Sequence, residues 1–222
     1  MDNFLQARAN MVESQVHTND VTDHRLLAAL HAIPREKFVP SQLRAIAYID
    51  EDLPLDGIEG VSNRYLMEPM PFARLVQLAD IQPDDLVLDI GCATGYSAAV
   101  LARLASSVVA LEQNEHLANL ANENLPLVDA GNAAVVTGDL AAGYPSEGPY
   151  DVIIVNGAVD DIPQTLCNQL KDGGRLVAVF NSNGIGKATL MKRAGETVSS
   201  RYAFDAAVKS LPGFEKKPSF VF

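Results

Sequence analysis

The chain has 222 residues, of which 48% are apolar and 20% charged, a composition typical of a folded globular protein rather than a disordered one. Its 17 basic and 28 acidic residues give a net charge of −11, which repels phosphate backbones, so we expect no nucleic-acid partner. No apolar run reaches the roughly 18 residues of a membrane span, and residues 1–4 carry no basic start of a signal peptide. The only cysteines, Cys92 and Cys167, lie far apart, which favours a reducing, cytoplasmic location.

The first third of the chain is predicted to be a helical N-terminal extension, residues 1–49. Apolar residues recur at helical spacing as far as Val16, and Thr22-Asp23 offers an N-cap for a second helix over residues 25–32. A short helix is expected over residues 41–48. Residues 49–66 are rich in Asp, Pro and Gly and are predicted to form a long loop, of a length that is usually functional or mobile.

After a helix predicted over about residues 68–80, short apolar strands alternate with helices. Strands are predicted over residues 86–90, 108–111, 133–136, 152–155 and 175–180, and helices over residues 96–105, 114–125 and 163–170. This alternation indicates a parallel sheet with right-handed crossovers. Two further strands around the turn 194–196 are expected to form an antiparallel hairpin. We therefore predict an α/β domain over residues 50–222, with a mostly parallel seven-stranded sheet that ends in this hairpin.

The strongest chemical signal is the turn that follows the first predicted strand, residues 89–95 (DIGCATG). In sheets of this kind, ligands bind at the carboxyl ends of the strands, where glycine lets a ligand approach the backbone closely. Gly91 and Gly95 do not have the G-x-G-x-x-G spacing of phosphate-binding turns, which disfavours a nicotinamide dehydrogenase. The spacing favours a ligand whose amino-acid end lies at the turn, and a tight turn without any ligand is the alternative.

Acidic residues also follow the next two predicted strands. Glu112 lies at about the 20-residue distance from Asp89 at which dinucleotide folds place the acid that binds ribose hydroxyls. Asp139 follows the third strand, where its carboxylate could accept a hydrogen bond from an adenine amino group. Each alone is more simply a solvated acid. Three such features at successive strand ends together favour an adenosyl ligand.

This combination resembles the S-adenosylmethionine-dependent methyltransferases of the Rossmann-like class, whose sheet ends with an antiparallel hairpin. Further blocks are similar to those of the protein-L-isoaspartate O-methyltransferase family, in order over about residues 8–180: 11–15 (MVESQ), 33–40 (IPREKFVP), 53–55 (LPL), 91–98, 150–155 and 170–177. The resemblance implies S-adenosyl-L-methionine as the cofactor. It implies methylation of the free carboxylate of isoaspartyl residues in damaged proteins, which starts their repair.

The implied cofactor site gathers the ends of the first three strands of the sheet. Its predicted residues are Asp89, Gly91, Cys92, Ala93, Gly95, Glu112, Gln113, Asp139 and Leu140. Ala93 replaces the middle glycine of the family's turn, which would be tolerated if its φ were negative. No metal site is predicted, because the histidines at positions 17, 24 and 31 lack a second ligand at helical spacing.

The acceptor side departs from the family pattern. The family carries a glycine-x-threonine-isoleucine-serine-x-proline block, and anchoring on Pro69 aligns it with residues 63–69 (NRYLMEP), so that Met67 stands at the position of the catalytic serine. Ser62 could take over only if the loop rearranges, and Arg64 could pair a substrate carboxylate. We therefore name Ser62, Arg64 and Met67 as candidate catalytic residues. Residues 156–161 (NGAVDD) are also more acidic than the family's apolar segment.

Methyl transfer to a carboxylate needs little acid–base help, because the nucleophile is already ionised at pH 7. Losing one hydroxyl hydrogen bond to that charge would lower the rate roughly ten- to a hundredfold. The predicted function is methylation of a peptide or protein with isoaspartate, with no membrane partner. The alternatives are a methyltransferase with another acceptor, or a protein that binds S-adenosylmethionine without isoaspartyl activity.

Overall fold

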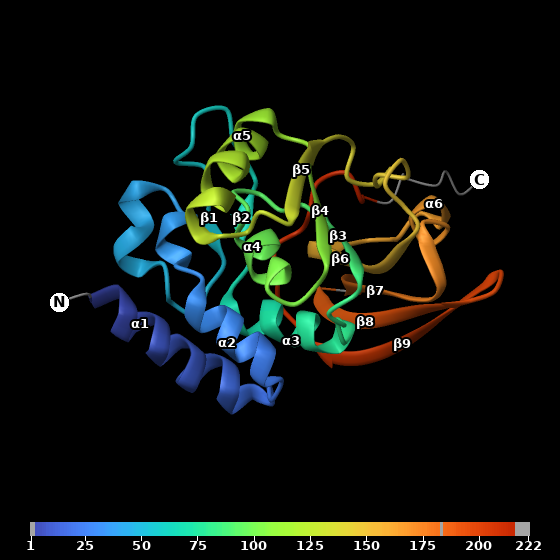
Figure 1. Ribbon diagram of the computed structural model, residues 1–222, viewed down its shortest axis with the longest axis horizontal. Helices are drawn as coiled ribbons and strands as arrows, with labels where there is room; N and C mark the ends of the chain where they lie inside the picture. The colour runs from blue at the N-terminus through green and yellow to red at the C-terminus, as the bar shows by residue number, and fades with distance from the viewer. Residues whose placement is uncertain (1–2, 183, 216–222) are drawn as a thin grey trace.

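The computed structural model describes residues 3–182 and 184–215 (Figure 1). Within these residues a seven-stranded sheet has the order β5-β4-β3-β6-β7-β8-β9. The parallel strands are β3 (Leu86–Ile90), β4 (Ser107–Glu112), β5 (Ala133–Thr137), β6 (Tyr150–Val159) and β7 (Leu170–Ser182). The hairpin β8 (Ile185–Ala194) and β9 (Thr197–Asp205) is antiparallel. The predicted α/β fold is confirmed.

The N-terminal third is helical, as predicted. It contains α1 (Asn3–Met11), which continues through π and 3-10 turns to residue 19, α2 (His24–Ala32) and 3-10 helices over Arg35–Lys37 and Ser41–Ile46. The Asp23 carboxylate caps α2 by accepting backbone N–H groups of its first turn. The helix predicted over residues 41–48 is thus a shorter 3-10 helix. The predicted loop 49–66 contains a small antiparallel ladder of β1 (Leu53–Pro54) and β2 (Tyr65–Leu66).

The helices that follow are α3 (Pro69–Ala79), α4 (Tyr96–Ala102), α5 (Glu115–Asn124) with a 3-10 turn over Leu125–Val128, and α6 (Gln164–Cys167). The prediction of a helix over residues 163–170 was too long, because β7 already begins at Leu170. The glycines at positions 173 and 174 do not precede this strand. They lie inside it, at a register shift between its pairing with Tyr150 and its pairing with Val152.

The sheet carries a buried apolar layer on each face, because successive strand residues point to opposite sides. Val87 belongs to the layer that also holds the N-terminal helices, α3 and α4. Leu88 belongs to the other layer, which is completed by α6 and by Leu211 and Phe214 of the C-terminal segment. The N-terminal extension therefore shares a core with the sheet, and the boundary at residue 49 remains a prediction.

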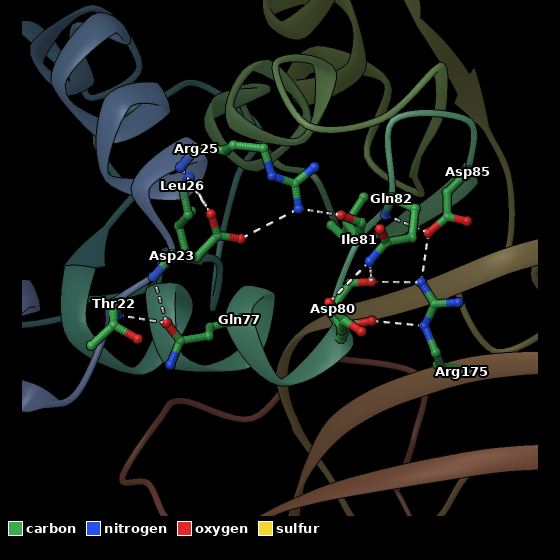
Figure 2. A network of polar contacts seen from close by, with 11 residues as sticks. Thr22, Asp23, Arg25, Leu26, Gln77, Asp80, Ile81, Gln82, Asp85 and Arg175 are labelled. Atoms are coloured by element: carbon green, nitrogen blue, oxygen red, sulfur yellow. Dashed lines mark hydrogen bonds and ion pairs between the residues drawn. The ribbon is translucent and has the colours of Figure 1, made fainter.

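A network of polar contacts ties the N-terminal helices, α3 and β7 together (Figure 2). The Gln77 side chain of α3 accepts the backbone N–H of Asp23 at 3.0 Å. From β7, the Arg175 guanidinium donates to the carbonyl oxygens of Ala79 and Asp80 at 2.8 and 2.9 Å. The last carbonyls of a helix have no partner within it, so this arginine stabilises the end of α3. Among the described residues, no helix has the length and apolar character needed to cross a membrane.

Candidate active site

The turn between β3 and α4 has the backbone that its glycines suggest. Gly91 has a φ of 78° and Gly95 a φ of 95°, both in the left-handed region that glycine favours. Ala93 also lies there, with a φ of 51°. The negative φ that would make its methyl group harmless is therefore absent, and the turn holds local strain of about 1–3 kcal/mol at this residue.

Asp89 is buried beneath this turn. Its carboxylate accepts a hydrogen bond from the Ser97 hydroxyl of α4 at 2.7 Å and another from the Asn156 amide of β6. Burial raises the pKa of Asp89 to about 7 against the lowering effect of these two bonds, and the nearby charge of Glu112 adds to the rise. In this structure Asp89 therefore fixes the turn to α4 and β6, and its contact with a cofactor remains a prediction.

Glu112 ends β4 at the same edge of the sheet and is fully buried. Its Oε1 accepts a guanidinium N–H of Arg64 and the backbone N–H of Asn114, the latter at 3.0 Å. Its Oε2 accepts the other terminal N–H of Arg64 at 2.7 Å and the backbone N–H of Ala93 at 2.9 Å. Arg64 is only 4% exposed. The predicted ribose-binding acid and a predicted acceptor residue are thus brought together in one bidentate buried ion pair.

The C-terminal segment covers the turn from another direction. Strand β3 ends at Ile90, and beyond it Ala158 of β6 pairs with Ser210 instead. Hydrogen bonds of 2.8 and 2.9 Å join Ala158 to Leu211 and Lys209. The segment therefore continues the sheet in line with β3. A Cβ added at Gly91 would lie 2.8 Å from Cδ1 of Leu211, so this side chain rests on the turn.

These neighbours leave little space on the side of the turn that faces Met67. The cavity bounded by Gly91, Ala93, Tyr65, Met67 and their neighbours has a volume of about 10 Å³, about that of one water molecule. Sites for small ligands measure about 300–1,000 Å³. The donors and acceptors at this edge match an adenosyl ligand in chemistry, and in this conformation Arg64 and Leu211 lie against the glycine turn.

The remaining predicted cofactor residues lie around the same strand ends. Cys92 is a buried free thiol whose pKa burial raises well above its usual range, so it is neutral. Gln113 is exposed, and Leu140 is buried in the second apolar layer. The exposed Asp139 caps the turn that follows β5, accepting the Ala141 N–H at 2.8 Å. Their roles toward a cofactor remain predictions.

The three candidate catalytic residues are placed differently. Arg64 and Met67 are buried at the turn, whereas Ser62 is exposed. The carbonyl oxygen of Met67 accepts a hydrogen bond from the buried guanidinium of Arg35 at 2.7 Å. The structure thus brings two of the three candidates to the glycine turn.

Sequence reasoning missed Asn156 and Leu211. Asn156 is the polar residue near the end of β6, so the strand-end rule that selected Glu112 could have found it. Its bond to Asp89 also changes the picture of residues 156–161, because this segment begins with an amide that supports the turn. Leu211 carried no signal, since a single leucine after the predicted hairpin looks like any core residue.

The parallel sheet, the glycine turn and the acids at its strand ends define a Rossmann-like methyltransferase. The model of the protein-L-isoaspartate(D-aspartate) O-methyltransferase family matches residues 6–208. The chain belongs to this family. Among curated relatives named protein-L-isoaspartate O-methyltransferase, one from Methanoculleus marisnigri is 43% identical over 80% of this chain and 78% of its own. One from Koribacter versatilis is 38% identical over 81% of this chain and 78% of its own.

Comparison with solved structures supports the same fold. One named protein-L-isoaspartate O-methyltransferase is 27% identical, with a TM-score of 0.78, and the match covers 94% of this chain and 67% of that one. A Plasmodium falciparum protein in complex with S-adenosyl-L-homocysteine gives a TM-score of 0.77 at 18% identity, covering 96% of this chain and 100% of that one, which supports the fold. The predicted family and reaction class are thus confirmed: S-adenosylmethionine-dependent methylation of isoaspartyl carboxylates in protein repair.

Proposed function

We propose that this chain methylates isoaspartyl residues from an open form of the site described above, in which Arg64 and Leu211 have moved off the glycine turn. The observation that carries this proposal is the convergence at one sheet edge of the turn 91–95, the buried acid Glu112 and the segment with Met67, within a chain of this family. We further propose Glu112 and the turn as the cofactor contacts. Asp89 would act through the turn.

On the acceptor side, we propose that Met67 occupies the place of the family's serine. The conformation of Asn63 supports this alignment, because its φ of 54° is one that glycine favours, and glycine begins the family's block. A thioether has no hydrogen to donate. Turnover should therefore be roughly ten- to a hundredfold lower than in a serine-bearing relative, the effect of losing one hydrogen bond to a charged group.

The acceptor carboxylate needs no general base, since it is already ionised at neutral pH. What the site must supply is proximity and alignment. Arg64 is the buried cation at the turn, and its guanidinium fits a carboxylate with two parallel bonds. Its pairing with the acceptor requires release from Glu112. The buried thiols and the net charge of −11 are compatible with the proposed cytoplasmic setting and with a protein substrate.

The test is a methyl-transfer assay with labelled S-adenosylmethionine and a synthetic isoaspartyl peptide. The matched control is the same peptide with a normal aspartyl linkage. Formation of S-adenosylhomocysteine with the isoaspartyl peptide alone would support the proposal. Binding of S-adenosylhomocysteine without turnover of either peptide would instead favour another acceptor or a silent binding protein. Met67 has no hydroxyl group, and Met67→Ser supplies one. This variant should therefore raise turnover per folded molecule.

A further inference from the structure

The ion pair of Arg64 and Glu112 leaves the carboxylate no free lone pair. A carboxylate offers about four acceptor positions, and here each oxygen accepts one guanidinium N–H and one backbone N–H. A ribose can therefore bond to Glu112 only by replacing a donor already present. Two of these donors are the backbone N–H groups of Ala93, in the glycine turn, and of Asn114, the cap of α5. The replaceable donor is the arginine side chain.

We propose that Arg64 and the cofactor compete for Glu112, so that the site exchanges between a closed form held by the arginine and an open form held by the ribose. This inference rests on the proposed function and deepens it. It assigns Arg64 a role in regulating cofactor access. Arg64 must leave Glu112 before it can pair with the acceptor carboxylate.

The backbone around Arg64 allows such an exchange. The segment is held by the short ladder of β1 and β2 and by the bond from the Leu55 N–H to the Arg64 carbonyl oxygen at 2.9 Å. These contacts involve the main chain and are independent of the guanidinium. Besides Glu112, the guanidinium contacts the Gly91 carbonyl oxygen at 3.4 Å, a long hydrogen bond. The long side chain can therefore leave the carboxylate while the ladder stays formed.

The exchange has a second consequence. A guanidinium released from Glu112 in this buried region is a cation without a partner, which is unfavourable until an anion approaches it. The same segment carries Met67, which lines the cavity at the glycine turn. A carboxylate acceptor arriving there would satisfy the released charge. Cofactor binding therefore prepares the anion site, and cofactor and acceptor should strengthen each other's binding.

The first experiment measures the dissociation constant of S-adenosylhomocysteine by titration calorimetry for the wild type, Arg64→Gln and Arg74→Gln. Arg74 is the matched control, because its guanidinium packs over the Phe204 ring at 3.9 Å, in a contact between α3 and β9. Removing the competitor should tighten binding about tenfold or more, since apparent affinity falls with the fraction of molecules that are open. Arg74→Gln should bind like the wild type.

The second experiment repeats the titration with a saturating isoaspartyl peptide. The peptide should tighten S-adenosylhomocysteine binding to the wild type about tenfold and leave Arg64→Gln unchanged, because the coupling runs through that side chain. Equal or weaker binding by Arg64→Gln in the first titration would overturn the competition. Failure of every variant to bind at millimolar ligand would overturn the proposed function itself, and the inference with it.

A measurement on the wild type covers the case in which Arg64→Gln does not fold. Arginine side-chain NMR signals report hindered rotation when a guanidinium is held in a buried bidentate pair. In the ligand-free protein the Arg64 signals, assigned with Arg64→Lys, should be of this kind. On addition of S-adenosylhomocysteine they should lose that hindrance. Signals that stay unchanged while calorimetry shows saturation would overturn the exchange.

Discussion

The glycine turn 91–95 and residues 62–67, which lie on it, are held in place by different interactions. The turn 91–95 takes its conformation mainly from its own glycines, because Gly91 and Gly95 adopt the left-handed backbone locally. Residues 62–67 reach the same place through distant partners: Arg64 through Glu112, and Met67 through Arg35. A site can thus have one half that is encoded locally and another that depends on the rest of the fold.

The largest effect is expected from breaking the contact between these two regions. Glu112→Gln leaves the buried Arg64 without an opposite charge, which should lower the free energy of unfolding by about 3–5 kcal/mol. Urea denaturation followed by circular dichroism measures this. The double variant Arg64→Gln/Glu112→Gln should recover part of the loss, since no unpaired charge remains. Equal stability of Glu112→Gln and the wild type would contradict the buried pairing.

The second prediction concerns Asp89, the buried acid beneath the glycine turn. Asp89 has a pKa of about 7 when folded, against about 4 for an unfolded aspartate. Its contribution to stability is therefore complete below the unfolded pKa and is lost as the pH rises through 7. Asp89→Asn cannot ionise, so its advantage over the wild type should grow by about 1.4 kcal/mol per pH unit between pH 5 and 7 and then level off. Urea titrations across this range would show a flat difference if Asp89 titrated normally.

These two acids show how far sequence reasoning reaches. The fold, the turn and the positions of Asp89 and Glu112 followed from strand patterns and strand ends, which are local signals. That Arg64 would reach Glu112 could not be predicted, because it depends on how the loop 49–66 folds back through β1 and β2. The same holds for Leu211, whose place is set by pairing with β6 beyond the end of β3.

A smaller effect is expected from the turn's first glycine. Gly91→Ala forces a side chain into the left-handed region, which should destabilise the protein by about 1–3 kcal/mol. The new Cβ would also press on Leu211. Leu211→Ala loosens the core by itself, so the cost of Gly91→Ala is compared with and without it. In the Leu211→Ala background the contact is relieved, but the backbone strain should still lower the melting temperature. Equal melting temperatures of Leu211→Ala and the double variant would contradict the strain.

The smallest effect is expected at Ala93. Replacing it with glycine removes left-handed strain of about 1–2 kcal/mol but adds about 0.4–1 kcal/mol of entropy to the unfolded chain. The net gain in stability should lie between zero and about 1.6 kcal/mol, the difference of these terms. A clear loss of stability in urea denaturation would mean that the methyl group contributes packing that outweighs the strain.

The C-terminal segment links two properties that are usually separate. Leu211 and Phe214 complete the apolar layer on one face of the sheet, and Leu211 also rests on the glycine turn. A substitution that shrinks this leucine opens the turn and loosens the core at once. Selection for a durable protein and selection for an accessible cleft therefore act on the same side chain, so this position should change during evolution only together with its neighbours.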